Sequence, residues 1–253
     1  MKRERIDTLL VEFGFADSLA KAQALVMAGV VLVNEKRVEK SSESFSCAAK
    51  IRIKNDSAEN KFVGRGGLKL EKALRDFQIS ASEYVCLDVG SSTGGFTDCL
   101  LQNGAKRVVA VDAGTNQIDW KLRRDARVEV RENTNARYLA RQDFTEQFDL
   151  IVIDVSFISV TKILPAIVPL LKETGRIITL IKPQFEVRKG EVGVGGIVRE
   201  TEKHERVIAE INRFAETHGL KSSGVIDSPI LGADGNHEFL ALYSQNRIVY
   251  AGE

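Results

Sequence analysis

The stretch from Tyr84 to Gly95, which reads Y-V-C-L-D-V-G-S-S-T-G-G, constrains the fold of this chain more than any other. Its first six residues are mostly apolar and include β-branched side chains, which predicts a buried strand. A glycine-containing turn follows, and then residues 96–102 have the pattern of an amphipathic helix. Strand, glycine turn and helix predict a nucleotide-binding α/β domain, because glycines let a ligand approach the backbone and a helix N-terminus offers unpaired N–H groups.

The spacing of the turn distinguishes between cofactors. A dinucleotide-binding turn reads G-x-G-x-x-G, whereas here Asp88 precedes Gly90 and Gly94 in the pattern D-x-G-x-x-x-G. We associate this spacing with S-adenosylmethionine rather than with NAD. A second carboxylate, Asp112, ends the next apolar run 24 residues after Asp88, where a ribose-binding acid is expected. These glycines could instead serve an ordinary strand–helix turn, but the second carboxylate favours a cofactor site.

The turn and the strand ends that follow it supply the candidate cofactor contacts. A third strand is predicted at Val128–Arg131, and the two asparagines just after it lie where the cofactor base would bind. The residues predicted from this pattern are Asp88, Gly90, Ser91, Ser92, Thr93, Gly94, Asp112, Asn133 and Asn135.

Length and composition exclude several classes of protein. With 253 residues, 43% hydrophobic and 28% charged, the chain resembles a soluble globular protein with room for more than one domain. A net charge of +1 means that nucleic-acid binding would depend on local patches. No apolar run approaches the ~18–20 residues of a membrane span, and the start of the chain lacks the apolar core of a signal peptide.

The cysteines indicate the compartment. Cys47, Cys86 and Cys99 are odd in number and form no C-x-x-C pair, so they predict free thiols in a reducing compartment. We therefore expect a cytoplasmic protein. We also expect no metal site and no membrane partner, and we favour a monomer.

The first 54 residues have the pattern of a small α+β unit. Apolar residues at helical spacing predict a helix at 6–13 and a second helix that Asp17 or Ser18 caps. Short strands are predicted at 30–34 and 51–53. So small a unit has a limited core.

A linker divides the chain. Residues 55–63 are polar and aperiodic for most of their length, as is typical of a linker. We therefore predict an N-terminal domain at 1–54 and a larger domain at 64–253. In the larger domain, apolar runs alternate with helical patterns, which predicts an α/β fold with a mostly parallel sheet.

Four charged residues stand where the larger domain would bind a ligand. Lys69 follows a double glycine at the start of a predicted helix, Asp154 and Lys182 end predicted buried strands, and Glu238 begins the final strand. Ligands of α/β sheets bind at the carboxyl ends of the strands. An ordinary solvated lysine or a helix cap at Asp154 is the alternative, but a lysine that ends a buried strand needs a partner, which Asp154 could supply.

Two lysines and two carboxylates suit methylation of a ribose hydroxyl. The 2′-hydroxyl is a poor nucleophile. A buried lysine beside carboxylates can orient it, stabilise the developing oxyanion and, when neutral, accept its proton. In-line positioning of the methyl donor would do much of the rest. We therefore predict Lys69, Asp154, Lys182 and Glu238 as the catalytic group.

Motifs across the larger domain resemble one known family. They read G-R-G-G-L-K-L, L-D-V-G-S-S-T-G-G-F-T-D-C-L-L, D-V-S-F-I-S, I-K-P-Q-F-E and G-N-H-E-F-L, between residues 64 and 242. In combination they resemble the hemolysin A (TlyA) family, which has an FtsJ-type methyltransferase domain. The resemblance implies a Rossmann-like, mostly parallel sheet with an antiparallel last strand. It also implies S-adenosylmethionine-dependent 2′-O-methylation of cytidine in the ribosomal RNA of ribosomal subunits, a Lys–Asp–Lys–Glu tetrad at the four residues above, and Phe96 as an aromatic cofactor contact.

The N-terminal unit resembles the RNA-binding domain named after the fourth small-subunit ribosomal protein. The matching segments are R-I-D-T-L-L-V, A-D-S-L-A-K-A and G-V-V-L-V-N-E-K-R-V. One departure is Leu19, where that domain usually has arginine. The resemblance implies RNA contact, and the candidate residues are Arg5, Lys21, Lys36 and Arg37 here and Arg65, Arg188 and Lys189 in the larger domain. The last two lie in a glycine-rich segment, 185–196, that we expect to be a mobile lid or an RNA-contact loop.

Three other functions fit the sequence less well. A membrane-lysing protein, which the family name suggests, would need a span or a long basic amphipathic helix, and the sequence has neither. A non-catalytic RNA-binding or ribosome-assembly factor would have no need of an intact glycine turn with all four charged residues. Methylation of a base amino group usually requires prolines after the fourth strand, and D-V-S-F at 154–157 has none.

Overall fold

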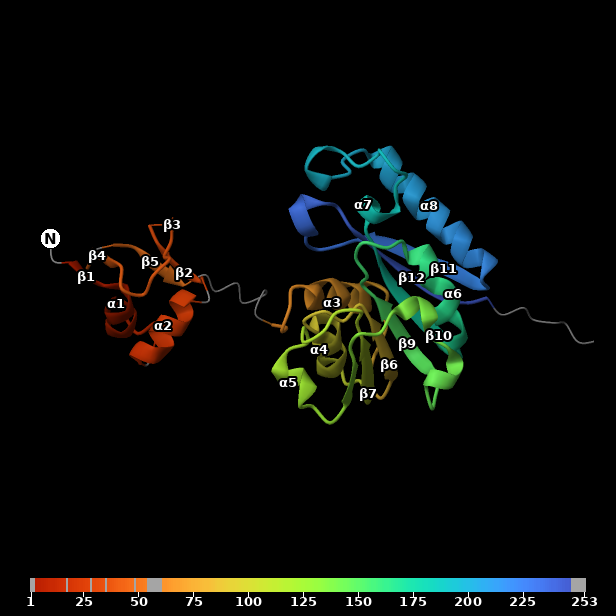
Figure 1. Ribbon diagram of the computed structural model, residues 1–253, viewed down its shortest axis with the longest axis horizontal. Coiled ribbons are helices and arrows are strands. Elements are labelled where there is room, and N and C mark those ends of the chain that lie inside the picture. The colour runs from red at the N-terminus through yellow and green to blue at the C-terminus, as the bar shows by residue number, and fades with distance from the viewer. Residues whose placement is uncertain are drawn as a thin grey trace, which may run out of the picture. The chain divides into compact units, whose positions relative to one another are not determined.

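The computed structural model describes residues 3–16, 18–27, 29–34, 36–47, 49–53 and 61–246 (Figure 1). The chain forms two compact units, Met1–Asn60 and Lys61–Glu253. Most of the predicted linker, residues 55–60, and the predicted cap Asp17 lie outside the described part. The alternative cap, Ser18, accepts the N–H of Lys21 at 3.3 Å through its hydroxyl oxygen.

The N-terminal unit contains both predicted helices and both predicted strands. Its elements are β1 (Arg3–Arg5), α1 (Ile6–Glu12), α2 (Leu19–Met27), β2 (Val31–Val33), β3 (Lys36–Arg37), β4 (Ser44–Ser46) and β5 (Ile51–Ile53). Strand β2 lies between β3 and β5, and β1 pairs with β4. Strands β1, β3 and β4 were not predicted, because each has only two or three mostly polar residues and so shows no alternation.

A hydrophobic core joins the helices of this unit to its sheet. Ile6 and Leu9 of α1 pack with Val26 of α2 and Val31 of β2, and all four are buried. Helical spacing predicted the three helix positions, whereas Phe13 and Leu19, which have the same spacing, lie at the helix ends and are exposed. Packing of the apolar faces, rather than helix propensity, therefore holds these short helices in place.

The larger unit is a seven-stranded sheet in the order β11-β12-β10-β9-β6-β7-β8. The strands are β6 (Val85–Val89), β7 (Arg107–Val111), β8 (Val128–Arg131), β9 (Phe148–Ile153), β10 (Leu171–Ile181), β11 (Leu220–Asp227) and β12 (Phe239–Gln245). Strands β6 to β10 pair in parallel, and β12, the last strand in the chain, runs antiparallel to both β10 and β11. The predicted mostly parallel sheet with an antiparallel last strand is confirmed.

Helices cover both faces of this sheet (Figure 1). They are α3 (Gly66–Asp76), α4 (Gly95–Gln102), α5 (Trp120–Arg123), α6 (Leu164–Ile167), α7 (Pro183–Glu186) and α8 (Thr201–Thr217). Alternate strand residues face two separate cores: Cys86 packs on the side of α3 and α4, and Leu87 on the side of α6 and α8. This two-sided burial explains the continuous apolar runs of the central strands.

The apolar run that begins at Phe148 was predicted to be a strand ending in Asp154, and β9 ends one residue earlier, at Ile153. Phe157 lies on the surface with a positive φ of 64°. The segment 160–171 was predicted to be helical but interrupted by its prolines. It is divided into a 3₁₀ turn, α6 and a second 3₁₀ turn, and Pro165 lies in the first turn of α6.

The glycine-rich segment 185–196 has defined contacts. Glu191 pairs with Arg206 of α8, and Lys203 of the same helix donates to the Glu191 carbonyl at 3.0 Å. The buried side chain of Asn236 donates to the Gly196 carbonyl at 3.0 Å and accepts the Val198 N–H at 3.1 Å. The segment is thereby attached both to α8 and to the loop that leads to Glu238.

Candidate active site

The glycine turn after β6 packs directly against the end of β9. Gly90 has a φ of +83°, and a Cβ on it would meet the carbonyl oxygen of Asp154 at 2.4 Å. Gly94 has a φ of +96°, and a Cβ on it would meet Leu122 at 2.2 Å. Glycine is required at both positions for its conformational freedom and for space. The turn therefore packs closely against the residue that follows β9, the parallel neighbour of β6.

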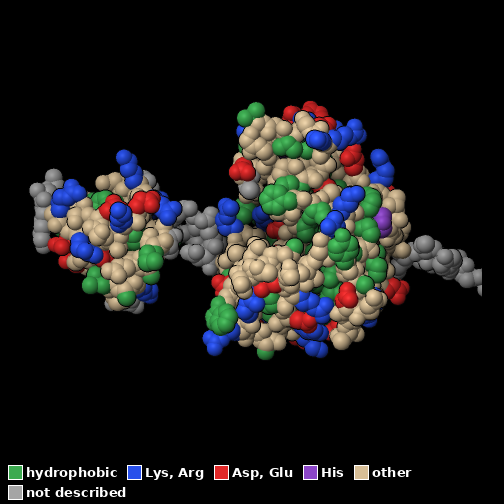
Figure 2. Space-filling view, viewed as in Figure 1, with side chains coloured by type: hydrophobic (Ala, Val, Ile, Leu, Met, Phe, Trp, Pro, Cys, Tyr) green, Lys and Arg blue, Asp and Glu red, His purple; other side chains and the backbone are tan. Residues whose placement is uncertain are grey.

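Two cavities lie beside this turn. The larger has a volume of about 470 Å³ and the smaller about 120 Å³, and Gly90, Ser92 and Asp154 line both. Figure 2 shows this face of the larger unit hollowed between the part that carries α7 and α8 and the part that carries α3. The larger volume falls within the range of small-molecule sites. Among the predicted cofactor residues, the cavity walls include Gly90, Ser91, Ser92, Thr93, Phe96, Asp112 and Asn135.

Asp112 connects the turn to the next strand end. Its Oδ2 accepts the Ser92 N–H at 2.8 Å, and its Oδ1 accepts the Gly114 N–H at 2.7 Å. Each carboxylate oxygen has a second lone pair. The carboxylate can therefore shape the turn and still accept a hydrogen bond from a ligand hydroxyl in the larger cavity.

Three predicted cofactor residues line neither cavity: Gly94 of the turn, Asn133 and Asp88. Asn133 is exposed, has a φ of +53°, and donates its N–H to the Gly114 carbonyl at 2.9 Å. Asp88 is fully buried beneath the turn, where its Oδ2 accepts the Thr97 hydroxyl at 2.6 Å and its Oδ1 has no partner among the described residues. Burial raises the pKa of Asp88 to about 7, against the opposing effect of the Thr97 hydrogen bond. Their contact with a cofactor stays a prediction.

The buried carboxyl of Asp88 predicts a pH dependence of stability. The folded state holds the proton up to about pH 7, whereas the unfolded chain releases it near pH ~4. Between these values the unfolded state binds fewer protons, so stability falls as pH rises, by about 1.4 kcal/mol per pH unit. We expect Asp88→Asn to remove most of this fall, measured by urea unfolding at pH 5 and pH 7. Asp227→Asn, at an exposed position, should leave the fall intact. An unchanged fall in Asp88→Asn would show that the folded protein carries this carboxylate ionised.

The four predicted catalytic residues form two ion pairs. Lys69 of α3 pairs with Glu238, and both side chains are buried. The Nζ of Lys182 lies 2.6 Å from Asp154 Oδ1, and it donates its well-directed hydrogen bond to Ser156 Oγ at 2.8 Å. Asp154 and Lys182 directly follow β9 and β10, and Glu238 directly precedes the antiparallel β12. All three therefore lie at the same edge of the sheet, because an antiparallel strand starts where its parallel neighbours end.

The start of α3 joins the two pairs. A Cβ on Gly66 would lie 3.4 Å from the Phe96 ring and 3.8 Å from Asp154 Oδ2. Lys69 is three residues further along the helix, on the same side. Gly232 packs against Glu238 of the Lys69–Glu238 pair, since a Cβ on Gly232 would meet Glu238 Oε1 at 2.0 Å. The structure thus places two lysine–carboxylate pairs at one edge of the sheet, and their catalytic role stays a prediction.

Two residues of the site were missed by sequence reasoning. Ser156 was not singled out, although it orients the Lys182 ammonium. Phe157 was not singled out either. The residue is 91% exposed and lines the larger cavity, and its ring centre lies 5.1 Å from that of Phe185. A phenylalanine in the left-handed region is strained and marks a constrained position. Apolar runs carry no signal of such a reversal, so only the backbone geometry reveals it.

The candidate RNA contacts are all at least partly exposed. Arg5 donates to both oxygens of buried Asp7, at 3.0 and 2.6 Å, and this pairing lowers the pKa of Asp7 to about 2. A guanidinium held in this way is oriented as well as partly neutralised. The other candidates, Lys21, Lys36, Arg37, Arg65, Arg188 and Lys189, are exposed. Their contact with RNA stays a prediction.

Comparison with known proteins decides the family. The FtsJ-like methyltransferase profile matches residues 62–244, and the S4 domain profile matches residues 4–44. The chain belongs to the FtsJ-like methyltransferase family. This methyltransferase carries an S4 domain before its catalytic unit, as the N-terminal pattern predicted.

Relatives match this methyltransferase over nearly its whole length. A Bacillus subtilis protein whose name marks it as a presumed rRNA methyltransferase, YqxC, is 47% identical over 94% of this chain and 85% of its own. The 16S/23S rRNA (cytidine-2′-O)-methyltransferase TlyA of Mycobacterium tuberculosis is 42% identical over 94% of this chain and 88% of its own. A solved Streptococcus thermophilus structure, which its name places among the hemolysins, is 44% identical with a TM-score of 0.76, and covers 98% of this chain and 90% of its own.

The described part of the methyltransferase contains no group of three His, Cys, Asp or Glu residues arranged to hold a metal ion. In the same residues, every helix is too short or too polar to cross a membrane.

Proposed function

We propose that the protein transfers a methyl group from S-adenosylmethionine to the ribose 2′-hydroxyl of cytidine in ribosomal RNA. The observation that carries this proposal is the convergence of two lysine–carboxylate pairs, Lys69–Glu238 and Lys182–Asp154, at the edge of the sheet beside the glycine turn. A methyltransferase that acts on an alcohol needs cationic groups at the hydroxyl. This site has two, each buried and each held by a carboxylate.

The cavities fit the cofactor. Bare backbone at Gly90 and Gly94 lets a ligand approach the turn, and Asp112 offers a carboxylate at the larger cavity for ribose hydroxyls. The smaller cavity, with Ser91, Thr93 and Phe96, would receive the amino-acid part, and the larger cavity would receive the adenosine. When bound, S-adenosylmethionine supplies an electrophilic methyl group that needs little further activation.

Lys182 is assigned the central role at the hydroxyl. Its Nζ is held by Ser156 and Asp154, which orient it and compensate its charge. In its neutral form Lys182 can accept the hydroxyl proton, and the ammonium so formed, held by Asp154, stabilises the negative charge that develops on the 2′-oxygen. Lys69, held by Glu238, supplies a second positive charge at the same edge. Because both lysines are buried, their interactions with the oxygen are screened little by water.

The S4 domain and the relatives support ribosomal RNA as the substrate. The Mycobacterium tuberculosis relative is named for cytidine 2′-O-methylation of both ribosomal RNAs. We assign RNA contact to Arg5, Lys21, Lys36 and Arg37 of the S4 domain and to Arg65, Arg188 and Lys189 of the catalytic unit. A substrate of this kind places the protein in the cytoplasm with the ribosomal subunits.

Methyl transfer from labelled cofactor tests the proposal. The acceptors are ribosomal subunits from cells that lack this protein, and the modified nucleotide is mapped after transfer. We expect label on the 2′-oxygen of a cytidine, and none on subunits from cells that contain the protein. Label on a base would contradict the assignment of the ribose. Tight cofactor binding without any transfer would instead favour the non-catalytic assembly factor.

A further inference from the structure

An exposed aromatic side chain lies outside the site described above. Trp120 is the only tryptophan of the chain, and 65% of its surface is exposed. It begins α5, the short helix after β7. Leaving an indole in water forgoes the stabilisation that its burial would provide. A tryptophan held on the surface is therefore a candidate contact for a partner.

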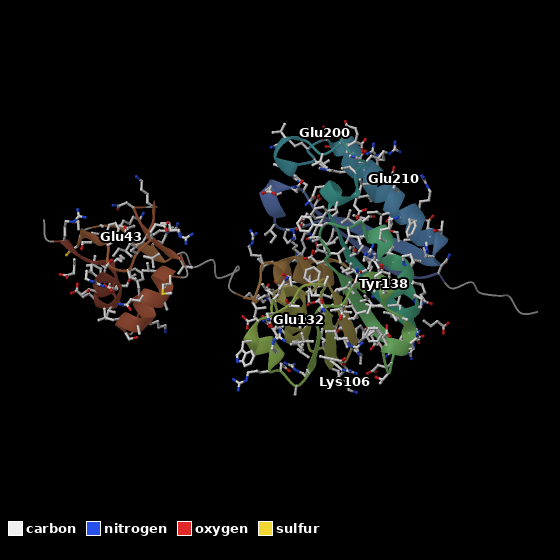
Figure 3. The ribbon with its side chains drawn as sticks, in the orientation of Figure 1. Glu43, Lys106, Glu132, Tyr138, Glu200 and Glu210 are labelled. Atoms are coloured by element: carbon white, nitrogen blue, oxygen red, sulfur yellow. The ribbon has the colours of Figure 1, made fainter. Side chains whose placement is uncertain are left out.

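The side chain stacked beside Trp120 is a cation, and the exposed carboxylate next to it in the chain, Asp119, accepts the Lys121 N–H at 2.8 Å. The Arg124 guanidinium lies 5.7 Å from the centre of the Trp120 ring, and Arg124 forms no ion pair with any residue that the structure describes. Its neighbours differ, since Arg123 pairs with Glu132 at 2.8 Å and Arg127 with Asp125 at 2.7 Å. Figure 3 labels Glu132, which lies beside α5.

Lys121 adds a second cation to this surface. Its side chain is 71% exposed, and its Nζ is 3.7 Å from Asp98 Oδ1, at the outer limit of an ion pair. We call Trp120, Lys121 and Arg124 the α5 surface.

The α5 surface lies between two functional places of the catalytic unit. On one side, Asp98 also accepts the Val63 N–H at 2.9 Å, so the surface borders the point where the chain of the S4 domain joins this unit. On the other side, the Asp119 N–H donates to the Thr93 carbonyl at 3.0 Å, which attaches α5 to the glycine turn. RNA that reaches the active site would therefore pass close to this region of the catalytic unit.

We propose that the α5 surface is a second RNA contact of the protein, separate from the S4 domain. The indole face stacks on an unpaired base, and Arg124 and Lys121 bind the adjoining phosphates. The exposed ring, with Arg124 against it and Lys121 beside it, matches an unpaired base and its phosphates in single-stranded RNA. A ribosomal protein is the alternative occupant, because tryptophan and arginine are enriched at protein–protein interfaces, and binding to protein-free ribosomal RNA distinguishes the two. This inference rests on the proposed function for the identity of the RNA.

The test uses the full-length protein and ribosomal subunits from cells that lack it. Affinity is measured by filter binding between 50 and 200 mM salt for Trp120→Ala, Trp120→Phe and Arg124→Gln. We expect Trp120→Ala to weaken binding about tenfold and Trp120→Phe to restore most of the loss. Arg124→Gln should also lower the slope of log affinity against log salt by about one.

The matched control is Arg127→Gln, which removes an exposed arginine that Asp125 already neutralises. It should leave affinity and slope within about twofold of the wild type. Cofactor affinity, measured by calorimetry, should be unchanged in all four variants, because none of these side chains lines either cavity.

Wild-type affinity in Trp120→Ala with an unchanged slope in Arg124→Gln would overturn the proposal. Weaker binding of Trp120→Ala to intact subunits, with normal binding to protein-free ribosomal RNA, would overturn it too, by assigning the surface to a ribosomal protein. The protein could also fail to methylate ribosomal RNA while the variants still lose RNA affinity. That result would uphold this contact and reject the proposed function.

Discussion

Replacement of Lys182 by alanine is expected to lower the rate of methyl transfer about 10³-fold, because it removes both the proton acceptor and the positive charge that stabilises the developing oxyanion. Lys182 lines neither cavity. The variant should therefore bind S-adenosylmethionine within about threefold of the wild type, a change worth less than about 1 kcal/mol. Single-turnover transfer to saturating ribosomal subunits, together with calorimetric cofactor titration, measures both quantities.

The matched control for this variant is Lys172→Ala. Lys172 also pairs with an aspartate across β9 and β10, since its Nζ lies 2.8 Å from Asp149 Oδ1, but at the opposite edge of the sheet. We expect this variant to keep normal transfer. Wild-type turnover in Lys182→Ala would remove Lys182 from the chemistry. An equal loss in both variants would show that the effect arises from the sheet and not from the site.

The second large effect is expected at the other ion pair. Glu238→Ala leaves the Lys69 ammonium buried without its carboxylate, which typically costs about 3–5 kcal/mol. We expect a loss of this size in the free energy of unfolding, measured by urea titration, together with a fall in methyl transfer of at least about 10²-fold. Glu238→Gln should lose less stability, because an amide oxygen still accepts a hydrogen bond from Lys69.

A double variant separates the two effects. Lys69→Met with Glu238→Leu replaces both charges with apolar groups, and such a replacement of a buried pair is often neutral or stabilising. Stability should return, whereas methyl transfer should stay low because the second cation is gone. Recovery of transfer along with stability would assign the pair a purely structural role.

Local pattern was enough to locate most elements of the catalytic unit. The strands at 85–89 and 128–131 lie within one residue of expectation, because a parallel strand covered on both faces must be apolar along its length. The glycine turn was also readable. Gly90 and Gly94 both adopt the positive φ that only glycine takes up without strain.

The surroundings of individual side chains were harder to predict from the sequence. The burial of Asp88 beneath the turn, against Thr97, could not be foreseen, because residue spacing does not show which way a strand side chain faces. Nor did the sequence show that Asp7 holds the candidate RNA contact Arg5. The exposed Phe157 and Trp120 carried no distinguishing pattern, since an apolar residue in sequence is most simply placed in the core.

The sequence by itself determined the kind of fold and the chemistry available to it. Apolar periodicity, glycine positions and charged strand ends are local patterns, so they can be read directly from the sequence. Only the tertiary structure decided which charges meet. Lys69 and Glu238 are 169 positions apart. They pair because β12 runs antiparallel beside β10. Glu238, just before β12, therefore lies at the edge of the sheet where Asp154 and Lys182 follow their strands. Strand order and direction are set by packing across the whole sheet, so no local segment of the sequence predicts them.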